Sequence, residues 1–173
     1  AANPADRCYH CKRALFSLLL QAARADGFSL VLDGSNASDD ASDRPGMRAL
    51  AELRVRSPLR ECDLDKGEIR RRARQAGLPV WDKPSYACLA TRIPTGTAIT
   101  APDLARVERG EAALMDMGFT DFRLRLRGEA ALLQVPGGQL EQARAGLEDI
   151  RRRLSADFCQ VQLDSVPRPT REN

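Results

Sequence analysis

The sequence predicts an α/β protein that carries a small α+β lobe at its C-terminal end. From Arg7 to Trp81, helical and strand-like segments alternate in the order of an α/β sheet. From about residue 100 the order becomes helix, strand, strand, helix, strand, which is typical of a small α+β lobe. An α/β sheet usually begins with a strand, so we expect the parallel sheet to be incomplete at its N-terminal end. We place the first domain at residues 1–92 and the second at 93–173.

Composition limits the class of protein. The chain has 173 residues, of which 43% are apolar and 29% charged, as in ordinary globular domains. A net charge of +3 is too small to predict a nucleic-acid partner. No apolar run reaches the ~20 residues of a membrane helix. Five cysteines without a secretory signal favour thiols used as ligands or reagents in a cytoplasmic protein.

The first elements are defined by periodicity and glycine. Residues 7–26 have the pattern of a helix that ends at Gly27 and places one set of side chains on a single face: Leu15, Leu18, Leu19, Ala22 and Ala23. The short apolar run 29–33 predicts a buried parallel strand. Residues 34–43 form a polar loop at the carboxyl end of that strand, where open α/β sheets bind their ligands.

The middle of the chain continues the alternation. We expect a helix at 45–53, and a short strand or the exit from one at 55–59. Asp65 begins the next helix, because Glu68 lies three residues further on as a capping-box partner, and Gly77 ends that helix.

The C-terminal lobe has clearer local signals. Thr100 is a good N-cap for a helix that runs to Met117 and stops at Gly118. Strict alternation over 122–127 predicts a strand. The remaining elements are expected at 131–135 (strand), 139–154 (helix) and 158–163 (strand).

The cysteines are the first candidates for chemistry. Cys8 and Cys11 are three residues apart, a spacing that suits a redox pair, half of a zinc site or half of an iron–sulfur site, and that also occurs by coincidence on a helix. Cys88 lies in a proline-flanked segment with basic neighbours, which favours a nucleophile or a ligand over a packed thiol. Cys159 alternates with apolar residues and is expected in the core, and Cys62 has no assigned role.

The strand at 122–127 carries an arginine at every second position. Arg123, Arg125 and Arg127 should therefore project from one face of the sheet, where like charges repel unless an anion lies across them. The alternative is a solvated face with glutamate partners. Glu111, on the buried side of the preceding helix, is a candidate partner for these arginines.

Taken together, these segments resemble the LarE family of ATP-dependent sulfur transferases. The resemblance covers about 160 residues, and its most specific motifs are Arg44-Pro45-Gly46 and Cys88-Leu89-Ala90-Thr91-Arg92-Ile93-Pro94. It implies an adenine nucleotide α-hydrolase-like fold of the pyrophosphatase-loop (PP-loop) type, followed by the small C-terminal lobe. It also implies activation of a carboxylate of a pyridinium dicarboxylate mononucleotide by ATP. Sulfur then replaces the activated oxygen, towards the nickel-pincer nucleotide cofactor of lactate racemase.

The resemblance also assigns roles to residues. It implies that the nucleotide substrate is lined by Thr91, Arg92, Glu111, Arg123 and Arg125. It implies that ATP, with Mg²⁺, is bound in part by Asp33, Gly34, Asn36 and Arg44. Some family members give up the sulfur of a cysteine, which would make Cys88 the catalytic thiol. Others hold a [4Fe-4S] cluster on three cysteines, which Cys8, Cys11 and Cys88 match.

Departures from the family pattern leave alternatives open. The Ser-Gly-Gly-x-Asp-Ser loop that cradles ATP phosphates precedes the first residue of this chain, so we expect residues 1–173 alone not to release pyrophosphate from ATP. The segment Ala131–Gln134 lacks the charged residues usual there. We expect a small nucleotide substrate, a homo-oligomer, no membrane and no nucleic acid. The competing functions are a tRNA-thiolating enzyme of the same superfamily and a non-catalytic zinc- or iron–sulfur-binding fragment.

Overall fold

The computed structural model describes residues 2–39, 45–84 and 86–169. These residues form two compact units, one of residues 4–83 and one of residues 84–169 together with residues 2–3. The division at 83/84 puts Cys88, Thr91 and Arg92 in the same unit as Glu111 and the arginine strand.

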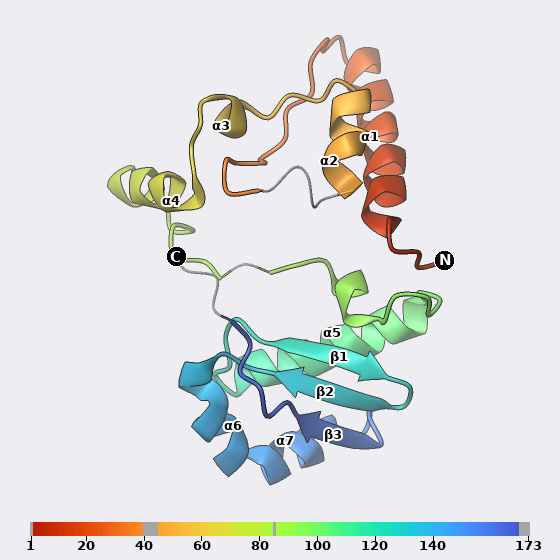
Figure 1. Cartoon of the computed structure of the whole chain (residues 1–173), viewed down its shortest axis with the longest axis vertical. Coiled ribbons are helices and arrows are strands. Elements are labelled where there is room, and N and C mark those ends of the chain that lie inside the picture. The colour runs from red at the N-terminus through yellow and green to blue at the C-terminus, as the bar shows by residue number, and fades with distance from the viewer. Residues whose placement is uncertain (1, 40–44, 85, 170–173) are drawn as a thin grey trace. The chain divides into compact units, whose positions relative to one another are not determined.

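The N-terminal unit is helical. Its helices are α1 (Arg7–Ala25), α2 (Pro45–Glu52), α3 (Pro58–Glu61) and α4 (Lys66–Gln75), and α1 packs along α2 (Figure 1). The predicted ends of α1 and α4 are confirmed: Gly27 takes a positive φ of 83°, and the Asp65 side chain accepts the backbone N–H of Glu68. Among the described residues, no helix combines the length and the apolar character that crossing a membrane requires.

The apolar face predicted for α1 is not its buried face. Leu15, Leu18 and Leu19 are 51%, 65% and 44% exposed, whereas the buried residue of this helix is Tyr9. The Tyr9 hydroxyl donates to Glu52 on α2 at 2.7 Å, so α2 covers the tyrosine side of α1 and leaves the leucines uncovered within this unit. Periodicity identified the apolar stripe correctly, but the position of α2 determines which face is buried.

The two strands predicted in this unit are also wrong as regular strands. Residues 29–33 and 55–59 meet in a single parallel bridge between Leu32 and Arg56, and Leu30 and Leu32 are 48% and 53% exposed. Pro58 begins α3, because its fixed φ suits the first turn of a helix, and this ends the extended segment early. The parallel direction was predicted correctly, but the regular sheet of the described residues lies in the other unit.

The C-terminal unit is a three-stranded sheet covered by helices. The chain runs through a 3₁₀ helix η1 (Leu89–Arg92), α5 (Ala101–Asp116), β1 (Arg123–Arg127), β2 (Ala130–Gln134), η2 (Gly137–Gln139), α6 (Leu140–Ala145), α7 (Leu147–Leu154) and β3 (Gln160–Leu163). The strand order is β1-β2-β3, with β1 antiparallel and β3 parallel to β2. This order confirms the predicted α+β lobe, except that the single helix expected at 139–154 is interrupted at Gly146.

The two faces of this sheet have opposite characters. One face packs its apolar side chains beneath α5, which runs behind the strands in Figure 1, and its core includes Leu124, Leu133 and Val161. Helix α5 approaches closely at Gly110, where an added Cβ would lie 2.6 Å from Leu124 Cδ2. The other face carries the alternate residues of β1, which are the three arginines.

Cys159 is exposed rather than part of the core, which corrects the prediction for that thiol. It lies just before β3, and its neighbour Phe158 is the residue that enters the core. Alternation fails here because pairing with β2 begins only at Gln160, so the period of a strand does not extend back to Cys159.

Candidate functional site

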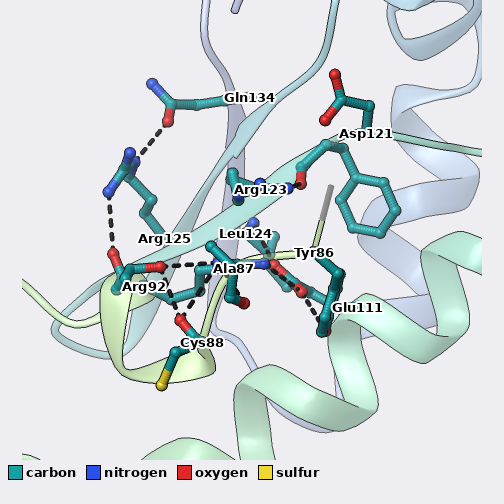
Figure 2. A network of polar contacts seen from close by, with 12 residues as sticks. Tyr86, Ala87, Cys88, Arg92, Glu111, Asp121, Arg123, Leu124, Arg125 and Gln134 are labelled. Carbon is teal, nitrogen blue, oxygen red and sulfur yellow. Dashed lines mark hydrogen bonds and ion pairs between the residues drawn. The ribbon is translucent and has the colours of Figure 1, made fainter. Parts of the chain in front are cut away.

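A buried ion pair lies at the centre of the site in the C-terminal unit. Arg92 of η1 donates from Nε to Glu111 Oε1 at 2.6 Å and from Nη2 to Oε2 at 2.9 Å, and both side chains are 0% exposed. The backbone N–H of Leu124 reaches Oε1 at 3.0 Å, and the Tyr86 hydroxyl reaches Oε2 at 2.6 Å (Figure 2). The sequence had suggested the strand arginines as partners of Glu111. In the structure its ion pair is with Arg92, because α5 presents the carboxylate to η1.

The segment that carries Cys88 is held by its backbone. The carbonyl oxygen of Cys88 accepts from Thr91 N at 2.9 Å, from Thr91 Oγ1 at 2.8 Å and from Arg92 Nη1 at 3.5 Å. Arg92 Nη1 also donates to Thr91 Oγ1 at 2.8 Å. Figure 2 shows the sulfur of Cys88 turned away from these contacts, and this cysteine is exposed. The arrangement leaves the thiol accessible while fixing the peptide beside it.

Hydrogen bonds join this segment to β1. Arg125 donates from Nη1 to the carbonyl oxygen of Thr91 at 3.0 Å and from Nε to Gln134 Oε1 at 2.5 Å. Gln134 in turn donates to Asp164 at 2.8 Å. Thr91 thus connects the Cys88 carbonyl with the Arg125 guanidinium, which puts a thiol-bearing segment next to a cationic sheet face (Figure 2).

The three strand arginines differ in burial. Arg123 is 7% exposed, Arg125 is half-buried and Arg127 is exposed. Burial lowers the pKa of Arg123 and of Arg125, and the neighbouring positive charges of Arg92 and Arg168 lower it further. A partly desolvated group of guanidinium groups is a favourable place for an anion, since the anion would offset their mutual repulsion.

Three residues of this network were not singled out from the sequence. Tyr86 lies two residues before Cys88, so its position in the same motif could have drawn attention to it. Burial raises the pKa of Tyr86 to about 12, and its hydrogen bond to Glu111 adds to the shift. Gln134 and Arg168 had no local signal: the first depends on the register of β2, and the second is placed by a bridge between Arg168 and Pro136.

The predicted nucleotide-binding residues belong to the N-terminal unit. Both carboxylate oxygens of Asp33 accept a serine hydroxyl, one from Ser35 and one from Ser57, each at 2.6 Å. Burial would raise the pKa of Asp33, but the hydrogen bonds from these serines and the charge of Lys12 keep it below its usual value. Asn36 accepts the backbone N–H of Ser38 at 3.0 Å.

The other two predicted nucleotide-binding residues are Gly34 and Arg44. Gly34 adjoins open space, with no atom within 4 Å of where a Cβ would lie. Arg44 lies outside the described residues.

Cys8 and Cys11 lie at the beginning of α1, and both are exposed. Residues three apart on a helix share one face, so the two thiols can approach a common metal. Neither unit, in its described residues, brings together three His, Cys, Asp or Glu side chains that could hold a metal ion. Cys88 belongs to the other unit, and the three-cysteine ligand set therefore stays a prediction.

Fold and site together define a mixed α/β protein with a cationic sheet face next to an exposed thiol. Comparison with known proteins agrees with the family resemblance. The chain is 32% identical over 163 residues to the pyridinium-3,5-bisthiocarboxylic acid mononucleotide synthase of Lactiplantibacillus plantarum, a match that covers 94% of this chain and 59% of the relative. This similarity supports placing the chain in a LarE-like family.

Two uncharacterized proteins are also similar. One, from Synechocystis sp., is 41% identical over 141 residues, which are 82% of this chain and 53% of the relative. The other, from Methanocaldococcus jannaschii, is 29% identical over 133 residues, which are 77% of this chain and 52% of the relative. The chain thus spans between 52% and 59% of the length of these relatives. No protein-family model matches it.

Proposed function

We propose that this chain is the part of an ATP-dependent sulfur transferase that binds a pyridinium dicarboxylate mononucleotide and presents the sulfur-delivering site to it. The product would be a thiocarboxylate precursor of the nickel-pincer nucleotide cofactor of lactate racemase. The observation that carries the proposal is the hydrogen-bonded connection from the Cys88 carbonyl through Thr91 to Arg125. Similarity to the mononucleotide synthase of L. plantarum supports the substrate class.

The arginine face suits the acidic groups of such a substrate. Phosphate and carboxylate groups are bound well by guanidinium pairs, and these contacts are stronger where the guanidinium is partly desolvated. Arg123 and Arg125 meet that condition, and Arg127 does not, because it is exposed. We assign the substrate's phosphate to Arg123 and Arg125.

Glu111 and Arg92 have a different role in this proposal. The charges of Arg92 and Glu111 neutralise each other in the interior of the C-terminal unit, so we assign neither side chain to direct binding of the substrate. Their pairing keeps η1 in place and, with it, the hydroxyl and carbonyl groups of Thr91. We therefore assign Thr91 to the substrate-facing rim and the buried pair to its support.

The activating nucleotide is assigned to the N-terminal unit. A carboxylate that stays ionised, as Asp33 does, suits a site for ATP with Mg²⁺. Asp33, Gly34 and Asn36 lie together in the loop that the family resemblance assigns to ATP.

The thiols fit a [4Fe-4S] cluster in chemistry and exposure. Cys8, Cys11 and Cys88 are exposed and unbridged, and thiolates are the usual ligands of such clusters. A cluster held by three cysteines would supply an exchangeable sulfide at its fourth iron. If the cluster is absent, Cys88 itself is the sulfur source.

Titration calorimetry with the pyridinium dicarboxylate mononucleotide tests substrate binding by this chain. Arg125→Ala should weaken binding about ten- to a hundredfold, the loss of one charge-assisted contact of roughly 1.5–3 kcal/mol. Arg127→Ala is the matched control, since it removes an exposed arginine from the same strand. Equal and small losses of affinity in both variants would show that the arginines of β1 form a solvated face that does not bind the substrate. Salt-dependent tRNA binding that requires Arg125 would instead favour the tRNA-thiolating alternative.

Anaerobic reconstitution tests the ligand set. Substituting Cys8, Cys11 or Cys88 by alanine should lower the iron content and the visible absorbance. The equally exposed Cys62 and Cys159 are the controls and should change neither. A full cluster in Cys88→Ala would contradict the three-cysteine set.

A further inference from the structure

The segment from Tyr86 to Arg92 is attached to Glu111 at both of its ends. At one end the Tyr86 hydroxyl donates to Oε2 at 2.6 Å, and at the other the Arg92 guanidinium donates to both carboxylate oxygens. Glu111 is fully buried on the long helix α5, so it is a rigid anchor. Cys88 lies between the two attachment points (Figure 2).

The same contacts determine the direction of the Cys88 peptide. Besides its bonds to Glu111, Arg92 donates from Nη1 to the carbonyl oxygens of Ala87, at 3.2 Å, and Cys88, at 3.5 Å. With the two donors from Thr91, the Cys88 carbonyl is held towards the network, and in Figure 2 the sulfur points the other way. The orientation of the thiol therefore depends on contacts made by its neighbours rather than by the thiol itself.

The two attachments differ in burial. Arg92 is 1% exposed and held within η1, whereas Tyr86 is 50% exposed and lies in an irregular segment. The Tyr86 ring also lies 5.2 Å from the guanidinium carbon of Arg92, a cation–π distance. At the irregular end, the hydroxyl adds a directed bond to a charged acceptor, which is the stronger class of hydrogen bond.

We propose that Tyr86 is a positioning residue for the proposed sulfur transfer: through its hydrogen bond to Glu111 it holds the segment of Cys88 so that the thiol faces outwards. This inference rests on the proposed function for its purpose, but the tether itself can be measured without substrate. The hydrogen bond of Tyr86 is to Glu111 and its ring lies near Arg92, and the proposed function assigns the substrate's phosphate to neither of these residues, so Tyr86 acts through the position of Cys88.

A spin label on Cys88 measures the tether directly. In a chain with Cys8, Cys11, Cys62 and Cys159 replaced by serine, a nitroxide attached to Cys88 reports the motion of this segment. Tyr86→Phe keeps the ring over Arg92 and removes the hydroxyl, so the electron paramagnetic resonance spectrum should narrow, with label motion at least about threefold faster. An unchanged spectrum would overturn the proposal.

Tyr9→Phe is the matched control. Tyr9 is the other tyrosine of the chain, and its hydroxyl also donates to a glutamate, Glu52, at 2.7 Å. This variant loses an equivalent hydrogen bond in the N-terminal unit, so it should leave the Cys88 spectrum unchanged. Narrowing of equal size in Tyr9→Phe would assign the effect to general loosening and would likewise overturn the proposal.

Substrate binding separates this inference from the proposed function. Tyr86→Phe should bind the mononucleotide within about twofold of the parent chain, while Arg125→Ala binds it at least about tenfold more weakly. If the parent chain binds no mononucleotide, the proposed function fails although the spectral change remains. If Tyr86→Phe loses binding as Arg125→Ala does, Tyr86 contacts the substrate, and the positioning role is refuted.

Discussion

Removing one partner of the buried ion pair should destabilise the C-terminal unit strongly. In Arg92→Met the Glu111 carboxylate stays fully buried and keeps the donors Tyr86 and Leu124, but it loses its counter-charge and two hydrogen bonds of 2.6 and 2.9 Å. Breaking a buried pair in this way costs about 3–5 kcal/mol. Since small domains are stable by only about 5–15 kcal/mol, the loss is a large part of the total.

Amide hydrogen exchange of β1 is the assay, because it reports opening of this unit separately from the N-terminal one. A loss of about 3 kcal/mol or more corresponds to exchange at least about a hundredfold faster. The double variant Arg92→Met/Glu111→Gln should regain part of the loss, since the glutamine removes the buried charge and still accepts from Leu124. The control is Arg109→Met on α5, the helix that also carries Glu111. This substitution breaks an exposed ion pair with Asp157 and should change the hydrogen exchange of β1 little.

Two results would refute this reasoning. The first is a loss in Arg92→Met no larger than in the exposed control, which would mean that the carboxylate finds water or another donor when its partner leaves. The second is strict additivity of the two substitutions, which would show that Arg92 and Glu111 are not energetically coupled.

Two further predictions concern stability. Gly110→Ala should lower the unfolding temperature despite the better helix propensity of alanine, because the new Cβ would lie 2.9 Å from Phe158 Cε2, and overpacking costs about 1–3 kcal/mol against a gain of about 1. Gly67→Ala in α4 is the control, where the nearest atom would be 3.4 Å away, and a lower unfolding temperature there of equal size would contradict the packing argument. Asp33→Asn should be less stable than the parent at neutral pH. The pKa of Asp33 is lowered in the folded state. Its carboxylate therefore stabilises the fold above the pKa of the unfolded state, and this stabilisation is lost as the pH falls through the pKa of the folded state. The urea midpoints of Asp33→Asn and of the parent chain, measured as a function of pH, test this prediction. A difference between the two midpoints that persists unchanged into acid would contradict stabilisation of the ionised Asp33 carboxylate by hydroxyl donors such as Ser57.

Sequence alone determined those features that depend on neighbours along the chain. Thr100 caps α5 by accepting the backbone N–H of Asp103 at 3.1 Å, and Gly118 ends that helix with a φ of 87°, both as predicted. Alternation located β1, and with it the face that carries the arginines. Helix caps, turns and the hydrophobic periodicity of helices and strands depend on residues that are close together in the chain, so a single sequence is enough to predict them.

Contacts between distant elements were decided by the tertiary structure. The leucines of α1 and the run at Leu30–Leu32 have apolar patterns, yet they are exposed, because burial depends on which element packs against them. Cys159 was misplaced for a related reason: pairing with β2 starts at Gln160, two residues later than the strand predicted at 158–163. A pattern shows what a segment is able to bury, but not whether a partner covers it.

The candidate site divides in the same way. The sequence predicted these residues of the candidate site: Cys88, Thr91, Arg92, Glu111 and the strand arginines. Glu111 forms its ion pair with Arg92 and accepts hydrogen bonds from Tyr86 and from the backbone of β1, and Thr91 bridges Cys88 to Arg125. These contacts follow from the docking of α5 and β1 against η1. Ion pairs between residues 19 positions apart depend on angles and distances that are set by the packed core, and no local rule of the chain encodes them.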